Sequence, residues 1–247
     1  MRSFRMNKKI CNFYCYRKTR PKTEVDVKKM DKLELVVFDM DGVLTDVLSS
    51  WKYIHDYFHT SNEKSVDLYV KGKIDDKEFI RRDAELWKID GKPMKEDQLK
   101  EILEDVQIMK GAKDTISFLK KNKIKTAIVS AGLDILANRI ANELGIDFVY
   151  ANGIKTDEQG YLNGDGIVGV KLRFKDETIK EISKEKNIKQ NRIVSIGNSC
   201  FDIPMFEASG FGIAFNPDDD CVCDCADFVI NKKDLTEILP IISRYLI

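Results

Sequence analysis

The sequence lacks several features that would place it outside the ordinary globular proteins. No apolar stretch approaches the roughly 20 residues needed to cross a bilayer, so we expect no membrane partner. The amino terminus has no uninterrupted apolar core of the kind found in secretory signals. The chain also carries no net charge, since 41 basic side chains balance 41 acidic ones. What remains is a chain of 247 residues with 43% hydrophobic residues, long enough for a core domain and a smaller inserted one.

Paired C-x2-C spacings, which mark structural zinc sites, are missing as well. Six cysteines occur: Cys200, the pair Cys11 and Cys15, and the group Cys221, Cys223 and Cys225. Their C-x3-C and C-x-C-x-C spacings do not resemble a secreted disulfide framework either. We therefore expect reduced thiols in a surface loop of a cytoplasmic protein. A metal site that joins the two groups is the less favoured alternative.

The zero net charge hides an uneven distribution. Residues 1–30 hold ten Lys or Arg against Glu24 and Asp26, a net charge of +8, which leaves −8 on the remainder. An acidic body argues against nucleic acid as a partner of the folded core. We expect residues 1–30 to be a basic, disordered leader or an artefact of start-site choice. An arm that binds nucleic acid or a membrane surface is the alternative.

The hydrophobic pattern alternates between short β-rich runs and amphipathic helices. Such alternation predicts an α/β fold, a doubly wound, mostly parallel Rossmann-like sheet with right-handed crossovers. Expected strands cover residues 33–38, 125–129, 147–150, 192–196, 211–215 and 227–230, expected helices cover residues 111–122, 133–144, 175–186 and 235–245, and residues 154–170 read as a hairpin.

Residues 47–108 interrupt this alternation. They show helical periodicity and dense charge without another β-rich run, and glycines punctuate them. We therefore predict a small helical cap inserted after the first strand. Residues 31–46 and 109–247 would form the core domain.

Two acids directly follow the first expected strand. Asp39 and Asp41 are separated by one residue and precede Gly42, at the carboxyl end of residues 33–38. Open α/β sheets bind their ligands at this edge. Like charges at close range repel, so the pair needs a bound cation or a division of labour between a nucleophile and an acid. We take this segment as the active site.

Two further strand ends carry polar residues that can meet this pair. Ser130, Ala131 and Gly132 follow one strand, and Asn198 and Asp202 follow another. In a parallel sheet these ends share one edge. The backbone amides and the hydroxyl at residues 130–132 would hold an anionic oxygen, although Ser130 taken alone is read first as a helix N-cap.

These segments together resemble the four motifs of the haloacid dehalogenase-like hydrolases, and most of all the phosphoserine phosphatase-like group. The resemblance rests on Asp-Met-Asp-Gly-Val-Leu at 39–44, Ile-Val-Ser-Ala-Gly at 128–132, a lysine near the next helix start, and Gly-Asn-Ser-Cys-Phe-Asp at 197–202. It covers about residues 33–240, in the motif order of that family.

The resemblance implies a role for each of these residues. Asp39 would attack phosphorus and form an aspartyl-phosphate, and Asp41 would serve as acid and then as base. Ser130, Ala131, Gly132 and Lys175 would bind the phosphoryl oxygens, with Lys171 as the reserve lysine. Mg²⁺ would be bound by Asp39, the carbonyl of Asp41, Asn198 and Asp202. The expected substrate is a small phosphorylated metabolite, with phosphoserine first.

Four positions depart from the family pattern. The usual metal-binding aspartate is Asn198, which removes one negative charge. Leu48 replaces a glutamate that contacts the amino acid, Asp83 lies near the position of a cap arginine, and Phe201 replaces an asparagine. Phosphoglycolate or another small phosphate, phosphotransfer to another alcohol, and a non-catalytic phosphate-binding module therefore stay open as alternatives.

Overall fold

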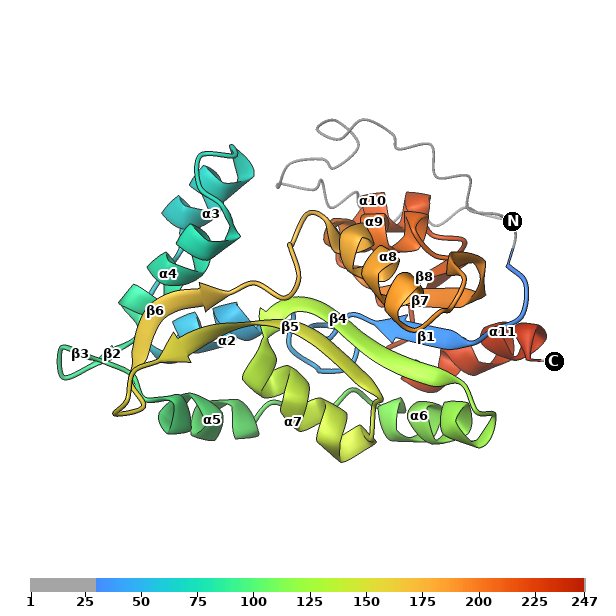
Figure 1. Cartoon of the computed structure of the whole chain (residues 1–247), viewed down its shortest axis with the longest axis horizontal. Coiled ribbons are helices and arrows are strands. Elements are labelled where there is room, and N and C mark those ends of the chain that lie inside the picture. Colours follow the sequence, from blue (N-terminus) through green and yellow to red (C-terminus); the bar gives the residue numbers. More distant parts are fainter. Residues whose placement is uncertain (1–29, 247) are drawn as a thin grey trace.

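The computed structural model describes residues 30–246. The expected leader, with Cys11 and Cys15, lies outside this range. One seven-stranded sheet, ordered β6-β5-β4-β1-β7-β8-β9, forms the centre of the molecule (Figure 1). Every neighbouring pair in it is parallel except β5 and β6. The strands are β1 Leu35–Phe38, β4 Lys125–Leu133, β5 Phe148–Thr156, β6 Leu162–Ile167, β7 Ile193–Gly197, β8 Phe211–Phe215 and β9 Phe228–Ile230.

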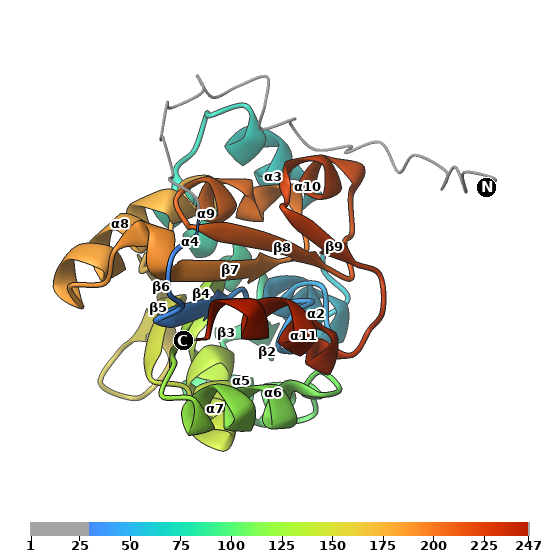
Figure 2. The same cartoon turned by 90° about the vertical axis from the view of Figure 1, so that its right-hand side faces the viewer.

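Helices cover both faces of this sheet, as the predicted α/β class requires. On one face lie α6 (Ala112–Lys121), α7 (Asp134–Leu144) and α11 (Leu239–Ile242), and on the other lie α8 (Lys175–Glu185), α9 (Ile203–Glu207) and α10 (Asp220–Cys225) (Figure 2). β1 shows why both faces are covered. Val36 and Phe38 belong to one hydrophobic cluster, whereas Leu35 and Val37 belong to the other. Because side chains alternate along a strand, β1 is buried on both faces.

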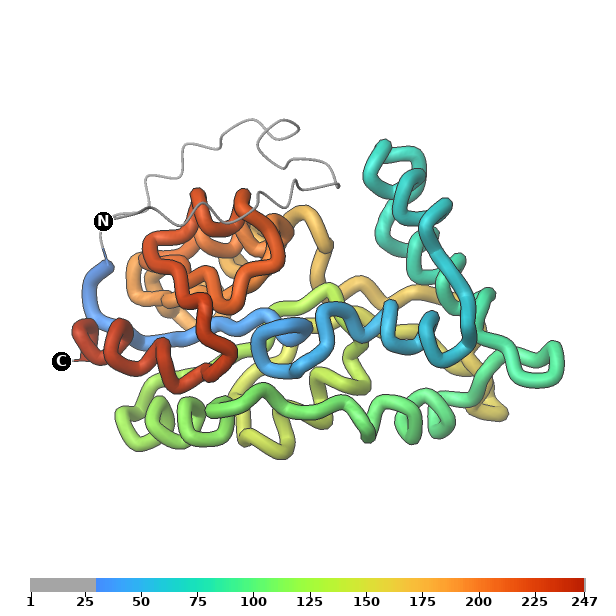
Figure 3. Tube along the Cα trace, turned by 180° about the vertical axis from the view of Figure 1, so that it is seen from behind, coloured from blue at the N-terminus to red at the C-terminus, as the bar shows by residue number. Residues whose placement is uncertain are grey.

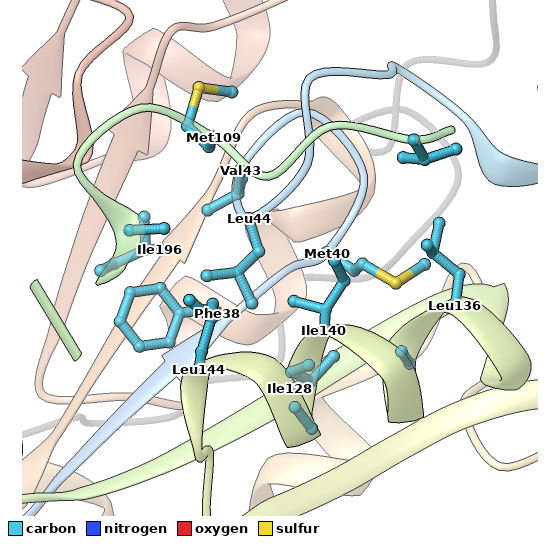
Figure 4. Packing of buried hydrophobic residues seen from close by; sticks show 14 of the residues in the cluster. Phe38, Met40, Val43, Leu44, Met109, Ile128, Leu136, Ile140, Leu144 and Ile196 are labelled. Carbon is cyan, nitrogen blue, oxygen red and sulfur yellow. The ribbon is translucent and has the colours of Figure 1, made fainter. Parts of the chain in front are cut away.

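The core continues past the end of β1. Met40 is fully buried between the two acids, and its side chain packs with Leu136 and Ile140 of α7 (Figure 4). Since consecutive side chains of an extended segment point to opposite sides, this packing directs Asp39 and Asp41 away from α7. An apolar residue between the acids thus fixes their orientation.

Four helices lie between β1 and α6 in the sequence. They are α2 (Ser50–Tyr57), α3 (Glu63–Val70), α4 (Asp76–Leu86) and α5 (Glu96–Glu104). The expectation of a purely helical segment was wrong in one detail, because β2 (Lys88–Ile89) and β3 (Lys92–Pro93) pair as an antiparallel hairpin. Asp90 and Gly91 form its turn with positive φ angles of 50° and 76°. Asp-Gly is a strong hairpin signal that could have predicted it.

The cap helices also contact the β5–β6 hairpin, which extends from the core sheet. α4 packs across β6, where a Cβ added to Gly166 would lie 3.1 Å from the Ile80 side chain. The view from behind shows the same side-by-side arrangement (Figure 3). The division into a cap at 47–108 and a core at 31–46 and 109–247 stays a prediction, with this hairpin as an element that both parts share.

Two further expectations need correction. Cys221, Cys223 and Cys225 lie half-buried on α10 and not in a loop, because Asp219 caps the helix by accepting a hydrogen bond from the Val222 amide at 2.9 Å. The expected closing helix is divided where Pro240 cannot donate a backbone hydrogen bond. Its parts are η3 (Leu235–Ile238), α11 and η4 (Ser243–Tyr245), and two other short 3₁₀ turns are η1 (Gln190–Arg192) and η2 (Cys200–Asp202). Within residues 30–246 no helix is both long and apolar enough to cross a membrane.

Candidate active site

The chain turns sharply where β1 ends, and this turn presents the two acids. The amides of Leu44 and Thr45 both donate to the carbonyl of Met40, at 2.9 and 3.0 Å. Gly42 has a φ of 74°, and a side chain there would collide with Asn198. Only glycine meets both demands, because L side chains rarely adopt this backbone and no room exists for a Cβ. The turn therefore brings Asn198 against the Asp39–Asp41 segment.

Lys175 links the first of these acids to Asp202. Its ammonium lies 3.0 Å from Asp39 Oδ1 and 2.6 Å from Asp202 Oδ1, and the whole side chain is only 2% exposed. Burial alone would lower the pKa of Lys175, but the two carboxylates outweigh burial and raise it. The amine therefore stays charged. Lys171, the reserve lysine, is exposed and pairs with Glu177 at 2.8 Å.

Asp39 is the more strongly perturbed of the paired acids. Burial, followed by the charge of Asp202, raises its pKa to about 7, although Lys175 and a hydrogen bond from Ser130 act in the opposite direction. Ser130 is buried, and its Oγ also accepts from the amide of Gly132 at 3.1 Å. The N-cap alternative for Ser130 was wrong, because β4 continues to Leu133, which is itself the N-cap of α7.

Asp41 accepts hydrogen bonds from Ser50, the first residue of α2 in the predicted cap. Its Oδ2 accepts hydrogen bonds from the Ser50 amide at 2.8 Å and the Ser50 hydroxyl at 2.9 Å. Its Oδ1 is buried and accepts none from any residue between 30 and 246. Burial raises the pKa of Asp41 to about 6, against the two bonds from Ser50. Gly132 allows this packing, because a Cβ there would lie 2.7 Å from Asp41 Oδ2.

The raised pKa of Asp41 predicts a pH-dependent cost in stability. Its ordinary pKa is 3.8, so between pH 4 and 6 the folded state binds more protons than the unfolded state. Stability contributed by this group is therefore lost as pH rises, by about 3 kcal/mol at most. In metal-free protein, we expect Asp41→Asn to raise Tm by ~2–6 °C at pH 8, and the gain to shrink towards pH 4.

Differential scanning calorimetry in the presence of a chelator measures this gain. Asp97→Asn is the control. It removes the same charge as Asp41→Asn, but from a side chain on α5 that is 86% exposed. A lower Tm for Asp41→Asn at pH 8 would contradict the prediction.

Asp202 is buried and connects Lys175 to the loop that follows β7. Its Oδ2 accepts from the amides of Asn198 at 2.9 Å and Ser199 at 3.0 Å, while its Oδ1 contacts Lys175. Both oxygens are thus engaged, which orients Lys175 and the loop that carries Asn198. Among the described residues no three His, Cys, Asp or Glu side chains gather as a metal cluster.

A cavity of about 860 Å³ opens over these groups and extends under the cap. Core residues form its floor, where Asp39, Asp41, Ser130, Lys175 and Asn198 all line it, and cap residues such as Trp51, His55 and Asp83 form its walls. Trp51 Nε1 donates to the carbonyl of Ala131 at 2.9 Å, so the cap contacts the 130–132 segment directly. The structure thus brings every site residue predicted from the sequence to one cavity, except Asp202, which lies buried behind it.

The sequence reasoning missed two residues that shape the site. Ser50 holds Asp41, and Asn152 accepts from the Val170 amide at 2.8 Å while donating to the Ala131 carbonyl at 3.3 Å. Ser49 and Ser50 precede a helical pattern, which is a helix-start signal that could have drawn attention to them. Asn152 carries no such signal, because its partners come from two distant segments.

A parallel sheet with two buried acids and a buried lysine at the carboxyl end of its central strand defines an α/β enzyme site. A family model for haloacid dehalogenase-like hydrolases matches residues 33–210, and the chain belongs to this family. The fold and family predicted from the sequence are thereby confirmed.

Within this family, the chain is similar to phosphoserine phosphatases. The phosphoserine phosphatase of Archaeoglobus fulgidus is 30% identical over 216 residues, 85% of this chain but only 60% of that protein's length. The phosphoserine phosphatase of Idiomarina loihiensis is 30% identical over 217 residues, 85% of this chain and 94% of that protein. A solved structure of a phospho-aspartyl intermediate analogue of phosphoserine phosphatase matches with a TM-score of 0.71 at 29% identity. The match covers 85% of this chain and 99% of the chain in that structure. The chain is a phosphatase of this family, similar to the phosphoserine phosphatases.

Proposed function

We propose that this chain hydrolyses phosphomonoesters of small metabolites through an aspartyl-phosphate on Asp39, and that phosphoserine is the first substrate to test. The observation that carries the proposal is the buried Lys175 ammonium, 3.0 Å from Asp39 on the floor of the cavity. A fixed positive charge beside a carboxylate stabilises the charge that develops on a transferring phosphoryl group. The phosphoserine phosphatases named above support the choice of first substrate.

In this mechanism the two acids divide the work. Asp39 attacks phosphorus as the carboxylate, and the bond from phosphorus to the leaving oxygen breaks. Asp41 gives its proton to that oxygen and later takes a proton from the water that cleaves the aspartyl-phosphate. A pKa of about 6 leaves Asp41 partly protonated near neutrality, as a group that acts in both directions requires. Ser130 and the Ala131 amide bind phosphoryl oxygens, while the Gly132 amide donates to Ser130 Oγ and orients it. Trp51 helps to exclude water.

A divalent cation fits the donors at this site. The Asp39 carboxylate, the Asp41 backbone carbonyl and the side-chain oxygen of the buried Asn198 are oxygen ligands, which Mg²⁺ prefers. The raised pKa of Asp39 also marks a carboxylate that lacks sufficient positive charge nearby. When bound, Mg²⁺ would neutralise charge on the carboxylate and the phosphate. Asp202 would act behind this set, through Lys175 and the Asn198 loop.

Asn198→Asp should tighten magnesium binding, because it restores a charge without adding volume beside Gly42. We expect the apparent Mg²⁺ midpoint to fall by roughly 3–10-fold, since ligand charge tunes such sites. The midpoint is read from activity and, independently, from the Mg²⁺-dependent rise of Tm. An unchanged midpoint in both assays would show that Asn198 does not face the metal.

Hydrolysis of 4-nitrophenyl phosphate, with Mg²⁺ titrated from zero, tests the proposed function. Activity that needs Mg²⁺ and Asp39 supports it. The departure at Asn198 favours a second candidate, a module that binds phosphate without turnover. Phosphate binding with no hydrolysis at any Mg²⁺ concentration would favour that module. Added alcohols that accept the phosphoryl group in place of water would reveal a phosphotransferase.

A further inference from the structure

The part of the cavity under the cap is lined by acids and aromatic rings. Beyond the floor it is bordered by the acidic side chains Asp56, Glu63, Asp67, Asp76 and Asp83 and by the rings of Trp51, His55, Tyr69 and Phe79. The only Lys or Arg side chains in the described lining are Lys52 and Lys175. Lys52 is exposed and pairs with Asp56 at 2.6 Å, and Lys175 belongs to the phosphate end. The space for the leaving group is therefore electronegative.

The two arginines of the cap do not change this balance. Arg81 Nε and Arg82 Nε each donate to Glu78 at 2.7 Å, on the same helix, and neither residue lines this cavity. The buried face of α4 is formed by Ile80, Asp83 and Ala84, and this explains why the two arginine side chains do not line the cavity. A carboxylate on the leaving group would thus meet neither guanidinium of α4.

Asp83 is the acid in this space that has unused hydrogen-bonding capacity. It is 2% exposed, and its Oδ2 accepts from Asn62 Nδ2 at 2.9 Å and lies 3.4 Å from His55 Nε2. Its Oδ1 is buried and has no donor among residues 30–246. A buried acceptor without a donor destabilises the folded state, and a ligand N–H group would remove this cost. Asp76, by comparison, already accepts from the Tyr69 hydroxyl and the Leu172 amide, at 3.0 and 3.2 Å.

We infer that the cap selects leaving groups that carry an ammonium group, recognised by Asp83, and that it does not recognise a carboxylate. The inference rests on the proposed phosphatase function and gives its substrate class: phosphomonoesters of amino alcohols. Phosphoserine is one member, with a carboxylate that has no cationic partner in the cap. Tyr69 and Phe79, stacked with their centroids 5.1 Å apart, and Trp51 supply aromatic surface that also attracts a cation.

Three substrates that differ in these two groups test the inference on the unaltered protein. O-Phosphoethanolamine has the ammonium group alone, O-phospho-L-serine has both groups, and 2-phosphoglycolate has the carboxylate alone. We expect kcat/KM for phosphoethanolamine to equal or exceed that for phosphoserine, and to exceed that for phosphoglycolate by at least tenfold. A tenfold preference for phosphoserine over phosphoethanolamine, or a preference for phosphoglycolate, would overturn the inference.

The Asp83→Asn variant tests the assigned residue. It keeps an acceptor for Asn62 but removes the charge, so the ratio of kcat/KM for phosphoethanolamine to that for 4-nitrophenyl phosphate should fall at least tenfold. Both substrates are measured on the same preparation, so loss of folded protein cancels in the ratio. Asp97→Asn, which removes an exposed charge of α5 outside the cavity lining, should leave the ratio unchanged.

The two proposals fail in different ways. If 4-nitrophenyl phosphate is not hydrolysed by the unaltered protein, the proposed function fails and takes the inference with it. If 4-nitrophenyl phosphate is hydrolysed with dependence on Asp39 but Asp83→Asn leaves the ratio unchanged, the inference alone is overturned.

Discussion

Asp39→Asn is expected to lower phosphatase activity by at least about 1,000-fold, because an amide cannot attack phosphorus to form the acyl-phosphate. The fold should persist, since the amide oxygen can still accept from the Met40 backbone amide, as Asp39 Oδ1 does at 2.8 Å. The variant also removes a charge whose burial raises the pKa of Asp39, so its thermal stability should not fall in step with activity. Steady-state hydrolysis of 4-nitrophenyl phosphate and calorimetry on the same sample separate the two effects.

The covalent step can be tested directly. A labelled phosphoryl donor should mark residue 39 in the unaltered protein, and beryllium fluoride should occupy the same position as a stable mimic. Asp97→Asn should label normally. Full activity in Asp39→Asn, or a label on another residue, would refute the assignment of the nucleophile.

Lys175→Ala is expected to have the second large effect, on stability and activity together. It leaves Asp39 and Asp202 buried without their shared cation, and breaking a buried ion pair in this way costs about 3–5 kcal/mol. Without the ammonium the pKa of Asp39 moves further above 3.8, so the folded state binds more protons than the unfolded state over a wider pH range. Stability should then fall as pH rises, and the variant should be least stable above pH 7.

Urea unfolding at pH 5.5 and pH 8 measures this difference, and activity should fall at least about 100-fold at either pH. Lys171→Ala provides the matched control. That lysine is four positions away, exposed and paired only at the surface with Glu177, so its removal should cost less than about 1 kcal/mol. If Lys171→Ala proved the more damaging of the two, the roles of the lysines would have to be exchanged.

The comparison of these lysines shows what the sequence could and could not decide. Both lie near the start of the expected helix at 175–186, and counting back from that helix favours Lys175 at its amino end, with Lys171 as the reserve. Burial separates them, because Lys175 begins α8 under the end of β1 whereas Lys171 stays in the preceding loop. The sheet and the positions of Asp39 and Asp41 were easier to predict, since they follow from two local patterns: alternation along strands, and polar residues at strand ends.

The walls of the cavity were beyond such reasoning. Asp83 sits on the buried face of α4, where the helical pattern calls for an apolar residue. Its partners, His55 and Asn62, come from α2 and from the residue before α3, and no periodicity links the three. Long-range contacts between polar side chains depend on how helices are placed in space, which local propensity does not determine.

The position of the β5–β6 hairpin limits how separable the two parts of this enzyme are. β6 forms the margin of the central sheet, and α4 lies across it, so the insertion and the scaffold share one strand. Excising residues 47–108 would uncover a strand margin open to pairing with other chains. A chimera that takes its substrate specificity from a relative would therefore need the β5–β6 hairpin of that relative together with its inserted helices.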